Sequence, residues 1–333
     1  MRKGAKAMQT SREVIRNAIE FSSPDRLPIN YEGPNGSDIY WVGWNQIGTG
    51  DKSKRFTYDE WHCGWRRTEQ ANMGQITEHP LTDWSLLEGF AWPNPNDPAL
   101  YEGMKERVAK RGDKYVLTSI FMLLFERLHG LRGFENLLAD LYWERDKVEY
   151  LADRIVAYDL AVIDNIKALC PSEIDGFSFT DDWGTETALM INPTLWREVF
   201  MPRYKQIFDR CHAHGWHVWM HSCGRVNDII EPLIEIGCNV LNLQQPRALG
   251  IEEIGKRFAG RICFETTCDI QHTLPFASDD EVEAEAKLLT AHWGTDCGGL
   301  ILSDYGDHRA IGSPLGRNAF MYKMFEKHSR WRV

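Results

Sequence analysis

The sequence predicts an α/β protein built as one (β/α)₈ barrel, and three observations carry this prediction. About seven or eight short apolar segments alternate with helical patterns of ten to twenty residues, which indicates parallel βαβ units. No glycine-rich dinucleotide fingerprint follows the first of these segments, which favours a closed barrel over a doubly wound open sheet. The length of 333 residues suits one barrel with insertions, and no linker or repeat divides it, so we expect a single domain over residues 1–333.

The first third of the chain contains one helix, one strand and a long irregular segment. Thr10 and Glu13 have the spacing of a capping box, and the apolar residues that follow them form a helical stripe. Residues 26–32 (RLPINYE) have the pattern of a short strand. From residue 33 to about 98 the chain is rich in Trp, Gly, Pro and Asp. We expect an elaborated hairpin and loop insertion there, after the first strand.

From about residue 113 the alternation of strands and helices becomes regular. Apolar runs of four to six residues predict the strands, and amphipathic stretches between them predict the helices. The predicted strands are 115–120, 176–180, 217–220, 239–243, 261–264 and 299–303. One predicted helical region ends at residue 169, and two further helices begin near residues 193 and 315. The remaining predicted helices cover 229–236, 251–258 and 280–293.

Composition and charge exclude several classes of protein. The net charge is −10, whereas a nucleic-acid partner favours a basic face. No apolar run reaches the roughly 18 residues that a membrane span requires, and the amino terminus lacks the apolar stretch of a secretory signal. We therefore expect a cytoplasmic protein. In that compartment the eight cysteines are reduced thiols or metal ligands rather than disulfides.

Polar residues that could bind metal or transfer protons follow most of the predicted strands. In a parallel barrel the carboxyl ends of the strands form the ligand site, so these residues are expected to gather at one rim. A polar residue after one strand means little, because loops are generally polar. Polar residues at the ends of five or six strands favour an active site. The residues are Glu32, Asp181, Asp182, His221, Cys223, Gln244, Glu265, Cys268, Asp304 and Tyr305.

His221-x-Cys223 is the sharpest local signal for a metal. Imidazole and thiolate are common zinc ligands, and both residues lie at the end of one predicted strand. A catalytic zinc takes three protein ligands and keeps one open position. Glu265 and Cys268, just beyond the strand 261–264, are the leading candidates for the third ligand, and Asp304 is a further one. Alternatively, His221 orients a substrate and Cys223 is a buried thiol.

The remaining rim residues are candidates for catalysis and substrate binding. Asp181 and Asp182 are both candidate catalytic residues, of which one is expected to act as a general acid or base or as a substrate anchor; alternatively, an aspartate here simply caps the turn. The segment 303–308 (SDYGDH) follows the last strand, and we expect Tyr305 to be catalytic. The expected substrate-binding residues are Glu32, Gln244 and Asp304.

Four segments in order resemble the uroporphyrinogen decarboxylase superfamily: SREVIRNAIEF with SPDRLPI, TDDWGT, HSCGRVNDIIEPLIEIGCNVLN and GGLILS. The resemblance spans nearly the whole chain and implies the (β/α)₈ barrel. True uroporphyrinogen decarboxylases carry an arginine-rich motif after the first strand, and this chain has YEGPNGSDIYWVG there, without arginine. The chain is thus more similar to the branch of corrinoid-dependent methyltransferases.

That resemblance implies a reaction, a cofactor and a partner. Members of this branch move a methyl group between a small methoxy, methylthio or methylamine compound and the cobalt of a separate corrinoid protein. Their zinc acts as a Lewis acid and is held by a His-x-Cys pair, which His221 and Cys223 resemble, plus a later ligand. In thiol-methylating members a Cys follows the last strand, and here that place holds SDYGDH.

Two other functions stay open at this point. One is a metal-free carboxy-lyase similar to uroporphyrinogen decarboxylase, with Asp181 as its key acid or anchor. The other is a non-catalytic barrel that binds a small ligand or a partner.

Overall fold

The computed structural model describes residues 8–31, 36–46, 53–69 and 73–331 of the chain. These residues gather into two compact units. Unit 1 comprises residues 1–41, 109–117 and 239–333, and unit 2 comprises residues 42–108 and 118–238, within the described ranges. Each unit is described by itself. Whether the chain is a single domain stays a prediction.

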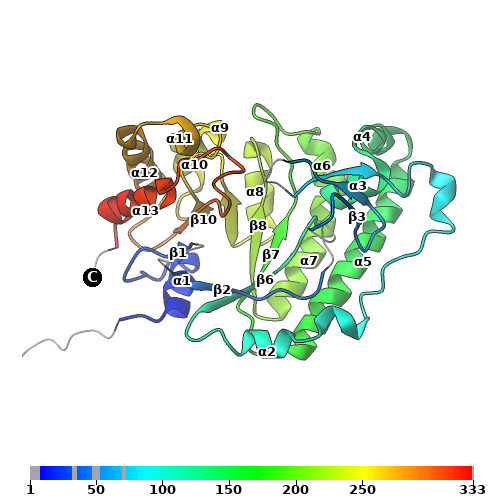
Figure 1. Cartoon of the computed structure of the whole chain (residues 1–333), viewed down its shortest axis with the longest axis horizontal. Coiled ribbons are helices and arrows are strands. Elements are labelled where there is room, and N and C mark those ends of the chain that lie inside the picture. The colour runs from blue at the N-terminus through cyan, green and yellow to red at the C-terminus, as the bar shows by residue number, and fades with distance from the viewer. Residues whose placement is uncertain (1–7, 32–35, 47–52, 70–72, 332–333) are drawn as a thin grey trace, which may run out of the picture. The chain divides into compact units, whose positions relative to one another are not determined.

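Unit 1 contains parallel strands that alternate with helices (Figure 1). β1, β11, β10 and β9 pair in this order, and β2 pairs in parallel with the first half of β6. The strands are β1 (Ile29–Asn30), β2 (Ile39–Trp41), β9 (Val240–Leu243), β10 (Cys263–Thr266), β11 (Leu300–Ser303) and the start of β6 (Tyr115–Ile120). The helices are α1 (Ser11–Ile19), α9 (Pro246–Leu249), α10 (Ile251–Phe258), α11 (Thr273–Phe276), α12 (Asp279–Trp293) and α13 (Arg317–His328).

Unit 2 combines parallel strands with a separate antiparallel sheet. β7 (Gly176–Thr180) pairs in parallel with β8 (His217–His221), and Thr180 lies opposite His221. The antiparallel strands are β3 (Phe56–Tyr58), β4 (Gly64–Arg66) and β5 (Gln75–Glu78). The α-helices are α2 (Met104–Val108), α3 (Phe125–Arg132), α4 (Phe134–Trp143), α5 (Arg145–Leu169), α6 (Pro193–Val199), α7 (Met201–Ala213) and α8 (Asn227–Glu235), and the 3₁₀ helices are η1 (Trp84–Leu87) and η2 (Pro98–Tyr101).

The local sequence explains where these elements begin and which side they bury. The predicted capping box starts α1: Thr10 Oγ1 accepts the N–H of Glu13, whose carboxylate accepts the N–H of Thr10. In β7, Phe177 and Phe179 are buried on the helix side, where Phe179 stacks on Phe208 of α7. The alternate residue Thr180 therefore faces the other side of the strand.

The insertion after the first strand is more ordered than the sequence predicts. Its described part contains the antiparallel sheet and η1, and η2 and α2 follow it. It also contains β2, which belongs with the parallel strands because it pairs with β6. Only three residues form β2, too few for a periodic pattern to mark it.

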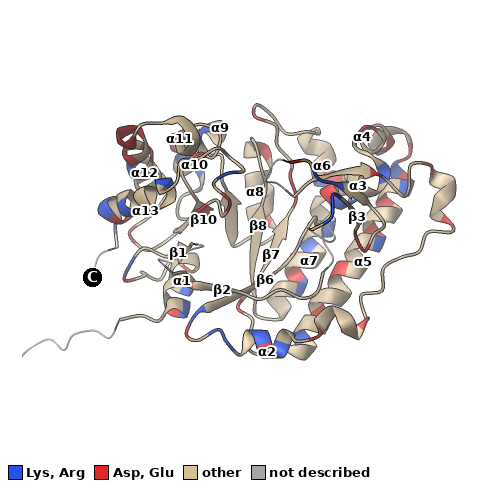
Figure 2. Ribbon diagram, viewed as in Figure 1, with Lys and Arg blue, Asp and Glu red and all other residues tan. Residues whose placement is uncertain are grey.

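Charged side chains are mixed on the long helices, and no described helix has the length and apolarity that a membrane span requires. Figure 2 shows Asp and Glu interspersed with Lys and Arg along α5. Such mixing is typical of solvated helix faces.

Candidate metal centre

Three side chains at the carboxyl ends of β7 and β8 converge in unit 2. The Sγ atom of Cys223 lies 3.4 Å from Nε2 of His221, and the same nitrogen lies 3.6 Å from Oδ1 of Asp182. Their ligand atoms all lie within 4.8 Å of one another. Within the described residues, this is the one group of three or more His, Cys, Asp or Glu side chains that meets this condition.

The register of the two strands explains this convergence. Thr180 lies opposite His221, so the residues that leave β7 run beside those that leave β8. The N–H of Asp181 donates to the carbonyl of His221, at 3.1 Å. The N–H of Cys223 donates to Oδ1 of Asp182, at 2.8 Å. Asp182 therefore both positions the backbone of Cys223 and presents a carboxylate to the cluster.

Two glycines let these loops approach each other. A Cβ atom on Gly224 would meet the carbonyl oxygen of Gly184 at 2.2 Å, and one on Gly184 would meet the nitrogen of Arg225 at 2.5 Å. Gly224 also has a φ of +76°, which favours glycine. The N–H of Gly184 donates to the carbonyl of Cys223, at 3.1 Å. The close approach of the two backbones thus fixes the position of Cys223.

We expect Gly224→Ala to displace Cys223 and to lower the free energy of unfolding by at least about 2 kcal/mol, because the clash adds to backbone strain. Gly215→Ala is the matched control: Gly215 has a φ of +79°, but its Cβ would meet nothing within 4 Å. Urea unfolding of both variants measures the difference. Equal losses of stability in the two variants would show that φ alone, and not the close approach, makes glycine necessary at position 224.

Asp181 and Asp182 have different surroundings. Asp181 is fully buried, and its carboxylate accepts the N–H groups of Leu124, Phe125 and Glu126 at the start of α3 as well as the hydroxyl of Tyr204. Burial raises the pKa of Asp181 to about 6, while the hydrogen bond from Tyr204 opposes the rise. All these bonds fix Asp181 at the start of α3. The catalytic roles expected for Asp181 and Asp182 stay predictions. Asp182, with 36% of its side chain exposed, is the accessible one.

α3 brings two further titratable side chains toward this site. Burial, followed by the charges of Asp182 and Asp181, raises the pKa of Glu126 well above its usual range. Burial, followed by the nearby His79, lowers the pKa of His129 to about 4, while Asp182 opposes this shift. Neither Glu126 nor His129 is among the site residues that the sequence predicts. A pattern that could have indicated them is their spacing of three residues on the first helix after a parallel strand, because this spacing places both side chains on one face of the helix.

The donor set fits a zinc ion. Imidazole nitrogen, thiolate sulfur and carboxylate oxygen are all zinc ligands, and tetrahedral zinc with bond lengths of about 2.0–2.3 Å separates its ligand atoms by about 3.3–3.7 Å. The separations of 3.4 and 3.6 Å lie in this range. Burial, followed by the charge of Asp182, raises the pKa of the Cys223 thiol. A cation at the centre would favour the thiolate instead.

The other predicted rim residues lie in unit 1. Gln244 follows β9, and Asp304 and Tyr305 follow β11, where Asn318 of α13 donates to the Asp304 carboxylate and to the Tyr305 carbonyl. Burial, followed by the charge of Asp304, raises the pKa of Tyr31 to about 12. Glu32 lies outside the described residues. The roles of these four predicted residues stay predictions.

The two leading candidates for a third ligand have other partners. β10 runs two residues further than predicted, so Glu265 lies inside the strand, is buried and accepts a hydrogen bond of 2.5 Å from Nδ2 of Asn30. Cys268 is fully buried, and its thiol donates to the carbonyl of Val282 in α12, at 3.8 Å. Burial raises the pKa of that thiol well above its usual range. Cys268 therefore packs against α12 rather than standing free at a rim.

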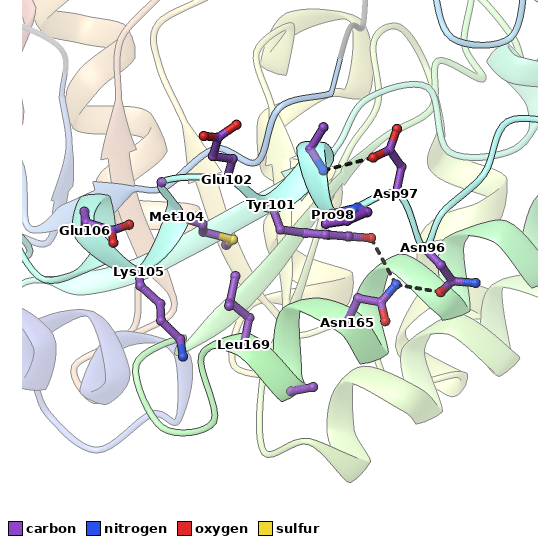
Figure 3. A pocket seen from close by; sticks show the side chains of 13 residues that line it. Asn96, Asp97, Pro98, Tyr101, Glu102, Met104, Lys105, Glu106, Asn165 and Leu169 are labelled. Carbon is purple, nitrogen blue, oxygen red and sulfur yellow. Dashed lines mark hydrogen bonds between the residues drawn. The ribbon is translucent and has the colours of Figure 1, made fainter.

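A hollow in unit 2 lies apart from this centre. Its volume is about 850 Å³, and it lies between the segment 96–106 and the last turns of α5, near Asn165 and Leu169 (Figure 3). Asn165 donates to Asn96 and to the hydroxyl of Tyr101. The lining includes no His or Cys and none of the residues that the sequence marks as a site.

Comparison with known families identifies the chain. The family model described as uroporphyrinogen decarboxylase (URO-D) matches residues 116–303, which is more than half of the 333 residues. The chain belongs to the uroporphyrinogen decarboxylase family. The matched range includes all three members of the cluster, and this finding confirms the resemblance seen in the sequence. No curated protein matches the chain in sequence.

Among solved structures, a methyltransferase from Methanosarcina mazei is similar over 96% of this chain and 98% of its own, with a TM-score of 0.70 and 13% identity. This likeness confirms that this member of the URO-D family has the predicted (β/α)₈ barrel fold. A xylanase from Thermotoga petrophila RKU-1 has a TM-score of 0.42, 10% identity and coverage of 74% of this chain and 83% of its own. At that TM-score, the xylanase adds nothing about function.

Proposed function

We propose that the chain is a zinc-dependent methyltransferase, which moves a methyl group between a small methylated compound and the corrinoid of a partner protein. The observation that carries this proposal is the cluster of Asp182, His221 and Cys223, in which the separations of His221 Nε2 from Cys223 Sγ and from Asp182 Oδ1 match those of a zinc site. The methyltransferase from Methanosarcina mazei, similar over 96% of the chain, supports the type of reaction.

In this proposal the three side chains divide the work at the site. His221, Cys223 and Asp182 hold the zinc, which supplies Lewis acidity to the oxygen, sulfur or nitrogen that carries the methyl group. Three protein ligands leave one position for that heteroatom. Asp182 also fixes the backbone of Cys223 through the bond of 2.8 Å, so thiolate and imidazole stay oriented while substrate binds and leaves.

Electrostatics supports the binding of a cation here. After burial, the charges of Asp182 and Asp181 raise the pKa of Glu126. After burial, the charges of Asp182 and Glu126 raise the pKa of Cys223. Arg127, the residue after Glu126, is bound to Asp59, at 2.7 Å. A dication relieves the repulsion between such groups, because opposite charge stabilises their ionised forms.

An anaerobic assay with cob(I)alamin as the methyl acceptor tests the proposal. The donors are methanol, methanethiol, methylamine and a methoxy-substituted aromatic compound, one for each kind of heteroatom. We expect methylcobalamin to form from one class of donor. Its formation should stop when a chelator removes zinc and resume when zinc is restored. Full activity of the metal-free protein, or decarboxylation of uroporphyrinogen without any methyl transfer, would contradict the proposal and favour the carboxy-lyase.

A further inference from the structure

Glu126 stands beside the zinc cluster without belonging to it. Asp181 accepts the N–H of Glu126, at 2.7 Å, and so sets this residue in the first turn of α3. The Thr180 hydroxyl, at the end of β7, lies near enough to this carboxyl group to oppose the burial-driven rise in the pKa of Glu126. Because Oγ1 of Thr180 accepts the N–H of Met122, at 3.0 Å, its hydroxyl hydrogen is available for Glu126.

The register of the strands places this carboxyl group next to His221. Thr180 and His221 lie opposite each other in the parallel pair of β7 and β8. Residues that are opposite in register project from the same side of the sheet. The Glu126 carboxyl group, near Thr180, therefore lies toward the side where His221 presents its ring. The charge of Glu126 also contributes, after burial and Asp182, to the raised pKa of Cys223.

One oxygen of this carboxyl group has no partner. Oε2 of Glu126 is buried and forms no hydrogen bond within the described part of the chain. Buried polar atoms are almost always bonded, and exceptions near functional sites indicate a missing partner. Glu126 is not part of the cluster whose ligand atoms lie within 4.8 Å of one another. Oε2 of Glu126 thus keeps an unfilled hydrogen-bonding position outside the cluster.

We propose that Glu126 is a substrate-binding residue, whose Oε2 hydrogen-bonds the ligand at the open position of the zinc. This inference rests on the proposed function, because it takes the cluster to be a zinc site with one free position. Asp182, His221 and Cys223 would hold the ion, and Glu126 would select ligands that carry a hydrogen-bonding heteroatom. A methyl–heteroatom substrate meets this requirement at the atom that releases or accepts the methyl group.

The test uses the full chain loaded with Co²⁺ in place of zinc and 2-mercaptoethanol as the probe for the open position. Visible absorption reports both the bound cobalt and the arrival of the thiol. We expect Glu126→Ala to bind cobalt as the unaltered protein does but to bind the thiol about 10- to 100-fold more weakly, as for the loss of a hydrogen bond to a charged group. Glu126→Gln should restore most of the affinity, because its amide also forms hydrogen bonds.

Glu135→Gln is the matched control, since Glu135 is exposed in the first turn of the next helix, α4. It should leave both affinities unchanged. Equal thiol affinity of Glu126→Ala and the unaltered protein would overturn the assignment while leaving the zinc site intact. Loss of cobalt from a folded Glu126→Ala would also overturn it, by making Glu126 a metal ligand. Failure of the unaltered protein to bind cobalt would overturn the proposed function itself. Should Glu126→Ala not fold, Glu126→Leu fills the same volume and takes its place.

Discussion

His221→Ala is expected to lower the affinity for zinc by at least about 100-fold. Even groups that only support a metal ligand change affinity by about 10- to 100-fold, and His221 supplies one of three proposed ligand atoms. Its Nε2 is the atom that both Cys223 and Asp182 approach, at 3.4 and 3.6 Å, so its removal opens the centre of the cluster. Competition with a chromogenic chelator measures the affinity.

His217→Ala provides the control for this variant. His217 begins the same strand, β8, that His221 ends, so the two histidines lie at opposite ends of one element. We expect His217→Ala to keep zinc affinity within about threefold of the original value. Zinc binding that is equally weakened in both variants, or unchanged in His221→Ala, would remove His221 from the proposed ligand set.

Asp59→Ala is expected to lower the free energy of unfolding by about 3–5 kcal/mol, because it leaves a buried charge without a partner. Arg127 is 1% exposed, and its Nη1 donates to Oδ2 of Asp59, at 2.7 Å. The same carboxylate accepts the N–H groups of Trp61 and Cys63 and the indole N–H of Trp65. One substitution thus removes the acceptor of four buried donors.

Urea unfolding, followed by circular dichroism, measures this loss. Asp83→Ala is the control, because Asp83 is exposed and only caps η1 by accepting the N–H of Ser85. It should cost about 1 kcal/mol. A loss of less than 1 kcal/mol in Asp59→Ala would contradict the view that this ion pair supports the position of α3.

The sequence predicts the strands and the proximity of His221 and Cys223 well where local patterns decide them. The bounds of β6 and β7 agree with the apolar runs 115–120 and 176–180. His221-x-Cys223 is recognisable because both residues belong to one strand end, so their proximity is local in sequence. The strand β10 shows the limit: its apolar run ends at Phe264, yet pairing continues through Glu265 to Thr266. The hydropathy pattern does not predict that a carboxyl group is buried and hydrogen-bonded within a strand.

The third proposed ligand depends on contacts that no local pattern contains. Whether Asp181 or Asp182 faces the site is set by the register of β7 against β8 and by the cap that Asp181 provides to α3. Both determinants join segments that lie 40 to 60 residues apart. The sequence does not predict Glu126 as a site residue, because the five residues FMLLF separate it from the end of β6. In each case tertiary pairing, rather than residue type, determines which polar side chain reaches the site.

X-ray absorption at the zinc K edge tests the central claim most directly, because it counts sulfur ligands. We expect the zinc-loaded protein to show one sulfur neighbour at about 2.3 Å and nitrogen or oxygen neighbours at about 2.0–2.2 Å, and Cys223→Ser to lose the sulfur signal. Two or more sulfur neighbours, a sulfur signal that survives in Cys223→Ser, or a protein that retains no zinc would contradict a centre made by Asp182, His221 and Cys223.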